Sequence, residues 1–173
     1  MNKEYFFVFV ILCIITHIIR SVYEILKHKK ILTPNKLSFV IILVNMLILW
    51  ISWFVLCTLD THRIDLNSVI RYSGIVLCVF GIVLFLTALF TIKTLESYEG
   101  DLITTGIYSK IRHPMYLAFI LWLIGFPIYS GALFSLYLSL VFIANILFWK
   151  YLEEKELEQR FISYKEYKKS TIF

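Results

Sequence analysis

The chain has 173 residues, of which 60% are hydrophobic, with a mean hydropathy of +0.80 and a formal net charge of +5 at pH 7. A soluble domain contains about 45–50% apolar residues, so this composition excludes one and indicates an all-α integral membrane protein. The positive charge requires no nucleic-acid partner, because Lys and Arg gather in short segments beside apolar stretches, as in cytosolic loops of membrane proteins.

Three charge-free stretches each predict one membrane crossing. The first is residues 5–19, which can continue past Arg20 to about Leu26; the others are 37–59 and 72–92. A crossing needs about 20 apolar residues. We expect residues 1–92 to form a three-helix transmembrane scaffold whose few polar side chains hydrogen-bond between helices.

A fourth stretch, residues 113–149, contains no Lys, Arg, Asp or Glu and is long enough for two crossings. Pro127 and Gly131 near its middle predict a turn. The sequence therefore predicts five transmembrane helices, the last two a tight helical hairpin of residues 114–129 and 132–153. A charged cytosolic C-terminal helix is expected over 151–170, with Leu157, Phe161 and Tyr164 along one face.

The Lys and Arg residues also predict the orientation of the chain. They concentrate in residues 20–36, 93–112 and 150–169, whereas the segments at the opposite ends of the helices carry few and mix them with acidic residues. Cytosolic loops are the ones enriched in Lys and Arg. We therefore expect the N-terminus outside the cell and the C-terminus in the cytosol.

Two loops differ in the function that their sequences predict. The loop of residues 93–112 is about 20 residues long, which is longer than a simple connector between helices. It carries Gly100 and Gly106 at turn positions. We expect residues 93–173 to carry the chemistry, within one structural domain overall. The outer loop 60–68 contains His62 between two Asp residues; three scattered ligands are weak evidence for a metal, and a solvated loop is expected.

The hairpin brings two distant polar clusters together. Arg112-His113-Pro114 opens the fourth helix, where Pro suits the first turn, and Glu153-Glu154 closes the fifth. The two helices rise about 24 Å and about 33 Å at about 1.5 Å per residue. Both clusters should therefore meet at the cytosolic face, although forty residues separate them in the sequence.

These residue types suit one kind of ligand. A cationic Arg, an imidazole, two carboxylates and the free N–H groups of a helix N-terminus would meet several aromatic rings. Such a pocket fits a zwitterion with a flat ring and a positive centre, because rings stack on a base or face a cation. The aromatic candidates are Tyr108, Tyr116, Phe161, Tyr164 and Tyr167. The plainer alternative is that Arg and aromatic residues mark the membrane interface.

The quoted segments resemble a known family. "LITTGIYSKIRHPMY" (102–116), Gly125, "EEKELEQRF" (153–161), Tyr164 and Tyr167 are similar to the isoprenylcysteine carboxyl methyltransferase family and its bacterial relatives, which include phospholipid methyltransferases. The resemblance covers roughly residues 93–170. It implies a membrane methyltransferase that uses S-adenosylmethionine and a lipophilic acceptor: an isoprenylcysteine-like carboxylate, a phospholipid amine or another small lipophile. The short chain fits a bacterial member in the cell membrane.

The resemblance also implies roles for individual residues. From the chemistry of methyl transfer we expect Arg112 to orient the acceptor or the cofactor's carboxylate, and Glu154, or His113, to take a proton from an amine acceptor. No metal is implied. The implied cofactor contacts are Leu102, Ile103, Tyr108, His113, Pro114, Met115, Tyr116 and Glu153. Two departures from the family pattern are "FISY", which lacks a Gly, and Trp149-Lys150, where the eukaryotic enzymes carry an Arg.

Two other functions remain open at this point. Sterol reductases look similar over an Arg-His-Pro-x-Tyr segment and use NADPH, although a phosphate-rich cofactor would favour more cations than Lys110 and Arg112. A non-catalytic membrane scaffold would make the two polar clusters accidental.

Overall fold

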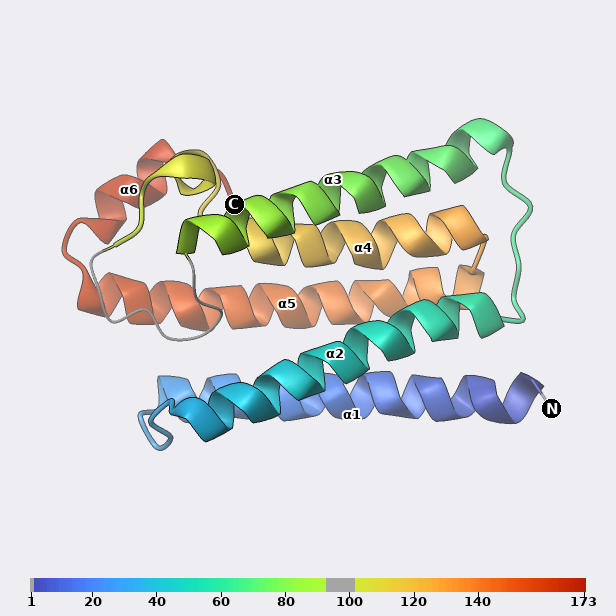
Figure 1. Ribbon diagram of the computed structural model, residues 1–173, viewed down its shortest axis with the longest axis horizontal. Helices are drawn as coiled ribbons and strands as arrows, with labels where there is room; N and C mark the ends of the chain where they lie inside the picture. The colour runs from blue at the N-terminus through green and yellow to red at the C-terminus, as the bar shows by residue number, and fades with distance from the viewer. Residues whose placement is uncertain (1, 93–101) are drawn as a thin grey trace.

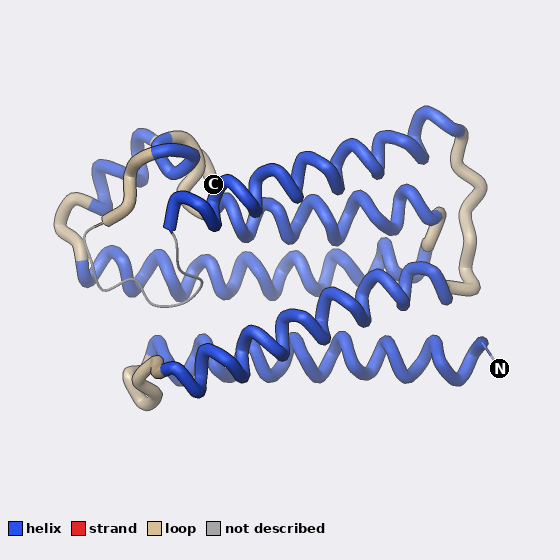
Figure 2. Tube along the Cα trace, in the orientation of Figure 1, coloured by secondary structure: helices blue, strands red, loops and turns tan. Residues whose placement is uncertain are grey.

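The computed structural model describes residues 2–92 and 102–173, and in this part the chain forms six α-helices and a 3-10 turn without a strand (Figures 1 and 2). The elements are α1 (Asn2–His28), α2 (Lys36–Leu59), α3 (Ser68–Ile92), the 3-10 turn η1 (Gly106–Ser109), α4 (Pro114–Ser130), α5 (Leu133–Arg160) and α6 (Tyr164–Ser170). Four of these helices, α1, α2, α3 and α5, are long and apolar enough to cross a membrane. The prediction of a helical integral membrane protein is confirmed.

The predicted helices of the scaffold agree closely with the observed ones. α2 begins and ends within one residue of its charge-free stretch, and α1 ends at His28, two residues beyond the expected end near Leu26. α3 begins at Ser68, before the predicted start at Tyr72. Asn35 caps α2: its side chain accepts from the Ser38 backbone N–H while the Ser38 hydroxyl accepts from the Asn35 backbone N–H. This reciprocal cap satisfies two N–H groups that a helix start leaves open.

The hairpin exists, and its turn, residues 131–132, lies one residue later than the predicted helix bounds imply. Pro127 lies inside α4, so the prediction that it helps form the turn is wrong. Gly131 alone ends the helix, with φ +67°, and its N–H donates to the carbonyls of Pro127 and Ile128. Glycine adopts this left-handed conformation at little cost. α4 has 17 residues, which is short for a membrane span.

The C-terminal segment is not one continuous helix. α5 continues to Arg160, Phe161 is extended with φ −124° and ψ 117°, and α6 begins at Tyr164. The prediction of a single charged helix over 151–170 is therefore wrong, and Leu157, Phe161 and Tyr164 do not share a helix face. The break lets α6 fold back, and the Tyr167 hydroxyl donates to the Tyr108 carbonyl at 2.6 Å across a buried contact.

The bundle is packed most closely where α3 meets α4. A Cβ atom added at Gly125 would lie 2.6 Å from the Gly74 carbonyl oxygen, so these two backbones touch directly. On the other side, fully buried Trp53 of α2 and Trp149 of α5 belong to one apolar core. In Figure 1 the α1–α2 loop, η1 and α6 lie at one end of the bundle, and the α2–α3 loop and the α4–α5 turn lie at the other. α4 and α5, from the predicted functional half, thus pack in one bundle with α1, α2 and α3.

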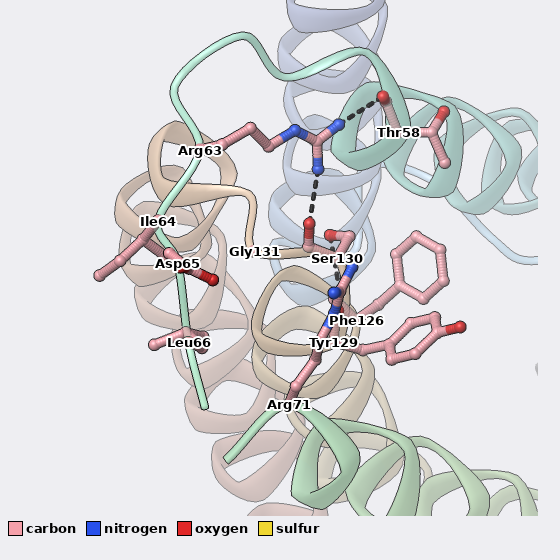
Figure 3. A pocket seen from close by; sticks show the side chains of 10 residues that line it. All are labelled: Thr58, Arg63, Ile64, Asp65, Leu66, Arg71, Phe126, Tyr129, Ser130 and Gly131. Carbon is pink, nitrogen blue, oxygen red and sulfur yellow. Dashed lines mark hydrogen bonds between the residues drawn. The ribbon is translucent and has the colours of Figure 1, made fainter. Parts of the chain in front are cut away.

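The loop between α2 and α3 is exposed over most of its length, as expected for a solvated loop, but its first residue is anchored in the bundle. Asp60 is buried, and its Oδ2 accepts from the backbone N–H of Ser135 at 2.8 Å and from its hydroxyl at 2.9 Å, which caps α5. Arg63 donates to the Thr58 and Ser130 carbonyls, as the dashed lines of Figure 3 show. A cavity of about 600 Å³ lies between these groups and Tyr129. This loop fastens the ends of three helices together.

Of the loop from Lys93 to Arg112, residues 93–101 lie outside the described part, and with them Gly100. Gly106 does occupy a turn, with φ +58°, at the start of η1. A Cβ atom there would lie 3.1 Å from the Thr91 hydroxyl oxygen, so α3 and η1 meet closely at this glycine.

Candidate functional site

The two predicted polar clusters meet at one end of the bundle. Arg112 Nε lies 3.3 Å from Glu154 Oε1, and His113 Nε2 lies 3.4 Å from the same oxygen. His113 Nδ1 is 3.9 Å from Glu153 Oε2. The expectation that residues 112–113 and 153–154 become neighbours through the hairpin agrees with these distances.

Pro114 places the histidine at the mouth of α4. It occupies the first helical position, where its missing N–H costs nothing, and His113 stands just before it with φ −124° and ψ 62°. The His113 side chain makes no capping hydrogen bond at this helix start. The first-turn N–H groups of Met115 and Tyr116 therefore keep the partial positive charge that a helix N-terminus presents to anions.

Glu154 is the centre of an ion-pair network. Its Oε2 lies 2.7 Å from Lys168 Nζ, and its Oε1 lies 3.7 Å from Lys150 Nζ, in addition to Arg112 and His113. The Glu154 side chain is 11% exposed. Lys168 also contacts Glu158 at 3.1 Å, and the two carboxylates raise the pKa of Lys168 above its ordinary value. One carboxylate thus ties α4, α5 and α6 together.

Arg112 is held by the segment that follows α6. Its Nη1 donates to the carbonyl oxygen of Lys168 at 2.9 Å and to the carbonyl of Thr171 at 2.5 Å. The Arg112 backbone N–H donates to Ile172 at 3.1 Å, and Ile172 donates in turn to Lys110 at 2.9 Å. The guanidinium is therefore fixed between α5 and the C-terminal residues.

Four of the five predicted aromatic residues line this region. The His113 and Tyr116 rings stack with centroids 5.6 Å apart, and Tyr164 contacts Tyr167 edge to face at 5.9 Å. Burial is the main cause that raises the pKa values of Tyr108, Tyr164 and Tyr167 above the ordinary value. These phenols therefore stay protonated hydrogen-bond donors at neutral pH. Phe161 instead occupies the break between α5 and α6.

Two buried polar atoms at the site have no hydrogen-bond partner within the described ranges 2–92 and 102–173. They are His113 Nε2, whose contact with Glu154 is not aligned as a hydrogen bond, and the Tyr164 hydroxyl oxygen. A buried polar atom without a partner costs about 1–3 kcal/mol. Each such atom in a native protein calls for an explanation, such as a bound ligand, an ion or a water molecule.

The remaining predicted cofactor contacts lie near the site in the sequence, and their side chains are only partly buried. Leu102 and Ile103 are half-buried just before η1, and Met115 is half-buried in the first turn of α4. Among the described residues, no group of three His, Cys, Asp or Glu side chains is arranged to hold a metal ion.

Sequence reasoning missed part of the polar network. Lys168 and Thr171 were not predicted, because the break at Phe161, which folds them back toward Arg112, has no clear sequence signal. Arg20 and Glu24 on α1 were also missed: they form an i, i+4 ion pair, and Glu24 is 4% exposed. A buried pair of charges on a membrane helix is a functional signal in its own right, and this one was visible in the sequence.

The fold and the site together define a class: a helical membrane protein with a charged, partly unsatisfied site at the mouth of a helical hairpin. The sequence profile of the family described as "Phospholipid methyltransferase" matches residues 69–163, more than half of the chain. The chain belongs to this family of membrane methyltransferases. No curated protein and no solved structure matches it.

Proposed function

We propose that this protein transfers a methyl group from S-adenosylmethionine to a lipophilic acceptor at the cytosolic face of the membrane. Family membership supports methyl transfer in a membrane. The observation that supports the donor is the meeting of residues 112–116 with Glu153 and Glu154, where His113 Nε2 and the Tyr164 hydroxyl are buried without partners.

The donor set fits this cofactor by its chemistry. Buried phenols and the stacked His113–Tyr116 pair suit an adenine ring, and the uncapped start of α4 suits a carboxylate. Glu153, whose side chain is 37% exposed, is available for ribose hydroxyls or an ammonium group. The proposed contacts are those of the sequence analysis: Leu102, Ile103, Tyr108, His113, Pro114, Met115, Tyr116 and Glu153.

The protein's part in the reaction is mainly positioning. S-adenosylmethionine supplies an electrophilic methyl group on a positively charged sulfur. The acceptor's lone pair forms the new bond to the methyl carbon from the side opposite the sulfur, whose bond to carbon breaks with its electrons. Holding the acceptor in line and excluding water lowers the barrier. A carboxylate or thiolate acceptor needs no base, whereas an amine gives up a proton, for which Glu154 or His113 is the proposed receiver.

Arg112 and Glu154 keep their proposed catalytic roles, and their neighbours in the structure indicate how each would act. Because Arg112 already donates to Lys168 and Thr171, we propose that it orients the ligand chiefly by holding Glu154 and the neighbouring His113 in place. Glu154 has three cationic neighbours, Arg112, Lys150 and Lys168, so it remains an ionised acceptor that keeps the mouth of α4 and the end of α5 together.

Titration calorimetry of the purified protein with S-adenosylmethionine tests the proposal. The wild type should bind, His113→Ala and Glu153→Ala should abolish binding, and His62→Ala at the far end of the bundle should have no effect. Absence of binding by the wild type, with NADPH binding instead, would favour a reductase and refute the proposal. Binding of neither would favour a scaffold. Incubation with labelled methyl donor and total lipid extract then identifies the class of acceptor.

The proposed topology has five crossings, α4 included, with the N-terminus outside and the C-terminus in the cytosol of a bacterial cell. In support, the α1–α2 loop and α6, both rich in Lys, lie at the same end of the bundle (Figure 1). A cysteine introduced at Lys169 should react with an impermeant reagent only after the membrane is opened. Reaction in intact cells would show that the C-terminus lies outside the cell, opposite to the proposed orientation.

A further inference from the structure

A groove opens between α1 and α5 on a face that no other described helix covers. It has a volume of about 630 Å³. Its rims are exposed apolar side chains such as Ile18 and Val141, on two helices that are long and apolar enough to cross a membrane. Lipid hydrocarbon chains, and not water, therefore meet this groove.

Three polar side chains, His17, Ser21 and Asn145, lie at the floor of this otherwise apolar groove. Ser21 donates to Asn145 Oδ1 at 2.9 Å, Asn145 Nδ2 lies 3.1 Å from His17 Nδ1, and Trp149 Nε1 donates to Ser21 at 2.9 Å. Hydrogen bonding between membrane helices accounts for Ser21 and Asn145. It does not account for His17 Nε2, which is buried without a partner among the described residues. His17 is 4% exposed.

The next turn of α1 carries the Arg20–Glu24 ion pair, on the same side of the helix as His17 and Ser21. The Arg20 guanidinium lies 5.8 Å from the Trp149 ring, the same side chain that donates to Ser21. Trp149 therefore joins the polar floor of the groove to the charged pair. Charges buried in a membrane protein are expensive to keep and usually serve a ligand or a transport path.

The charged pair in turn reaches the candidate cofactor site. Tyr116 is half-buried and stacks on His113, whose Nδ1 lies 3.9 Å from Glu153 Oε2. Glu153 follows Trp149 by one turn of α5, on the same helix face, and the Trp149 ring is the one that lies beside Arg20. The groove, the Arg20–Glu24 pair and Tyr116 thus form one continuous path from the lipid to the mouth of α4.

We propose that this path is the acceptor site: the groove between α1 and α5 holds the hydrocarbon chain of an amphiphile, and the Arg20–Glu24 pair holds its ionised head beside Tyr116. The inference rests on the proposed methyltransferase function, which it extends to the N-terminal scaffold helix. A head with a carboxylate or phosphate depends on Arg20, and a head with an amine depends on Glu24.

Filling the groove is the first test. Val141→Trp places an indole in it from a lipid-exposed position, and Val79→Trp, at an exposed position of α3, is the matched control. With labelled methyl donor and total lipid extract, Val141→Trp should raise the amount of lipid needed for half-maximal transfer at least fivefold. Its affinity for S-adenosylmethionine and the Val79→Trp kinetics should match the wild type. Unchanged transfer by Val141→Trp would overturn the proposal.

The head-group part is tested by Arg20→Gln and Glu24→Gln in the same assay. One of the two should raise the lipid requirement at least tenfold with unchanged cofactor affinity, and which one does so identifies the charge of the head. If neither changes it, the pair does not hold the acceptor. A loss of cofactor affinity in the variants would likewise refute an acceptor role.

A second readout does not depend on methyl transfer. Vesicles containing a phospholipid with a photoreactive diazirine in its acyl chain should label α1 and α5 peptides saturably in the wild type and in Val79→Trp, and much less in Val141→Trp. If the wild type fails to bind S-adenosylmethionine, this result still decides the groove. Equal labelling of all three proteins would overturn the lipid site independently of the proposed function.

Discussion

The two ends of the bundle use similar residues for different purposes. At the end with the α4–α5 turn, Asp60 caps α5 and Arg63 and Arg71 donate to the carbonyl oxygens that end α2 and α4. At the other end Arg112, Lys150 and Lys168 converge on Glu154. The first arrangement satisfies helix termini, whereas the second gathers several cations around one carboxylate and leaves buried polar atoms unpaired.

The difference indicates where buried polar groups without partners lower the stability of the fold. None of the polar atoms that are buried without partners in the described residues belongs to the Asp60 end, whereas His113, Tyr164 and Arg20 supply three of them at or beside the site. Unpaired buried groups persist in native proteins mainly where a function needs them. The contrast therefore points to the Glu154 end as the ligand-binding end, and substitutions at both ends can test it.

The largest effect is expected for Glu154→Ala. Removing the carboxylate leaves Arg112, His113 and Lys168 without their shared counter-charge, and breaking a buried ion pair costs about 3–5 kcal/mol. Thermal unfolding in detergent should shift strongly downward, and binding of S-adenosylmethionine should be lost. Retention of both properties would show that the cluster is a surface feature of no consequence.

His113→Phe should separate function from stability. His113 Nε2 has no hydrogen-bond partner to lose among the described residues, so the free energy of unfolding should change by less than about 1 kcal/mol. Cofactor affinity should nevertheless fall at least tenfold, as calorimetry would measure. The converse pattern, lower stability with intact binding, would make His113 a structural residue.

Asp60→Ala provides the comparison at the opposite end. Loss of the cap on α5 should cost about 0.5–2 kcal/mol in unfolding experiments. The affinity for S-adenosylmethionine should stay within twofold of the wild type, because the cap lies far along α5 from Glu154. A large loss of binding would contradict a structural role for the Asp60 end and a ligand-binding role for the Glu154 end.

The smallest effect is expected from pH. Glu154 and Glu158 raise the pKa of Lys168 in the folded protein, so its contribution to stability is complete below the unfolded-state pKa of about 10.4 and is lost as pH rises through the folded-state pKa. Protection of α6 amides from hydrogen exchange should therefore weaken in alkaline buffer. In Lys168→Met that pH dependence should disappear; if it remains, another group controls the docking of α6.

The sequence by itself determined the helices and the pairing of the two clusters. Long charge-free stretches specify membrane helices because nothing else satisfies the backbone in hydrocarbon, and a hairpin must return Glu153 and Glu154 to the level of His113. The conjunction of residues 102–116 with residues 153–161 and the tyrosines of the tail also indicated the family.

Only the tertiary structure decided what each polar residue faces. The break at Phe161, which brings Lys168 and Thr171 onto Arg112, depends on packing of α6 against η1 and has no period in the sequence. Likewise, Arg20 and Glu24 lie in a segment that composition alone assigns to the scaffold. Their place beside Trp149 follows from how α1 packs on α5, because local sequence sets a helix and its faces, but long-range packing chooses the neighbour of each face.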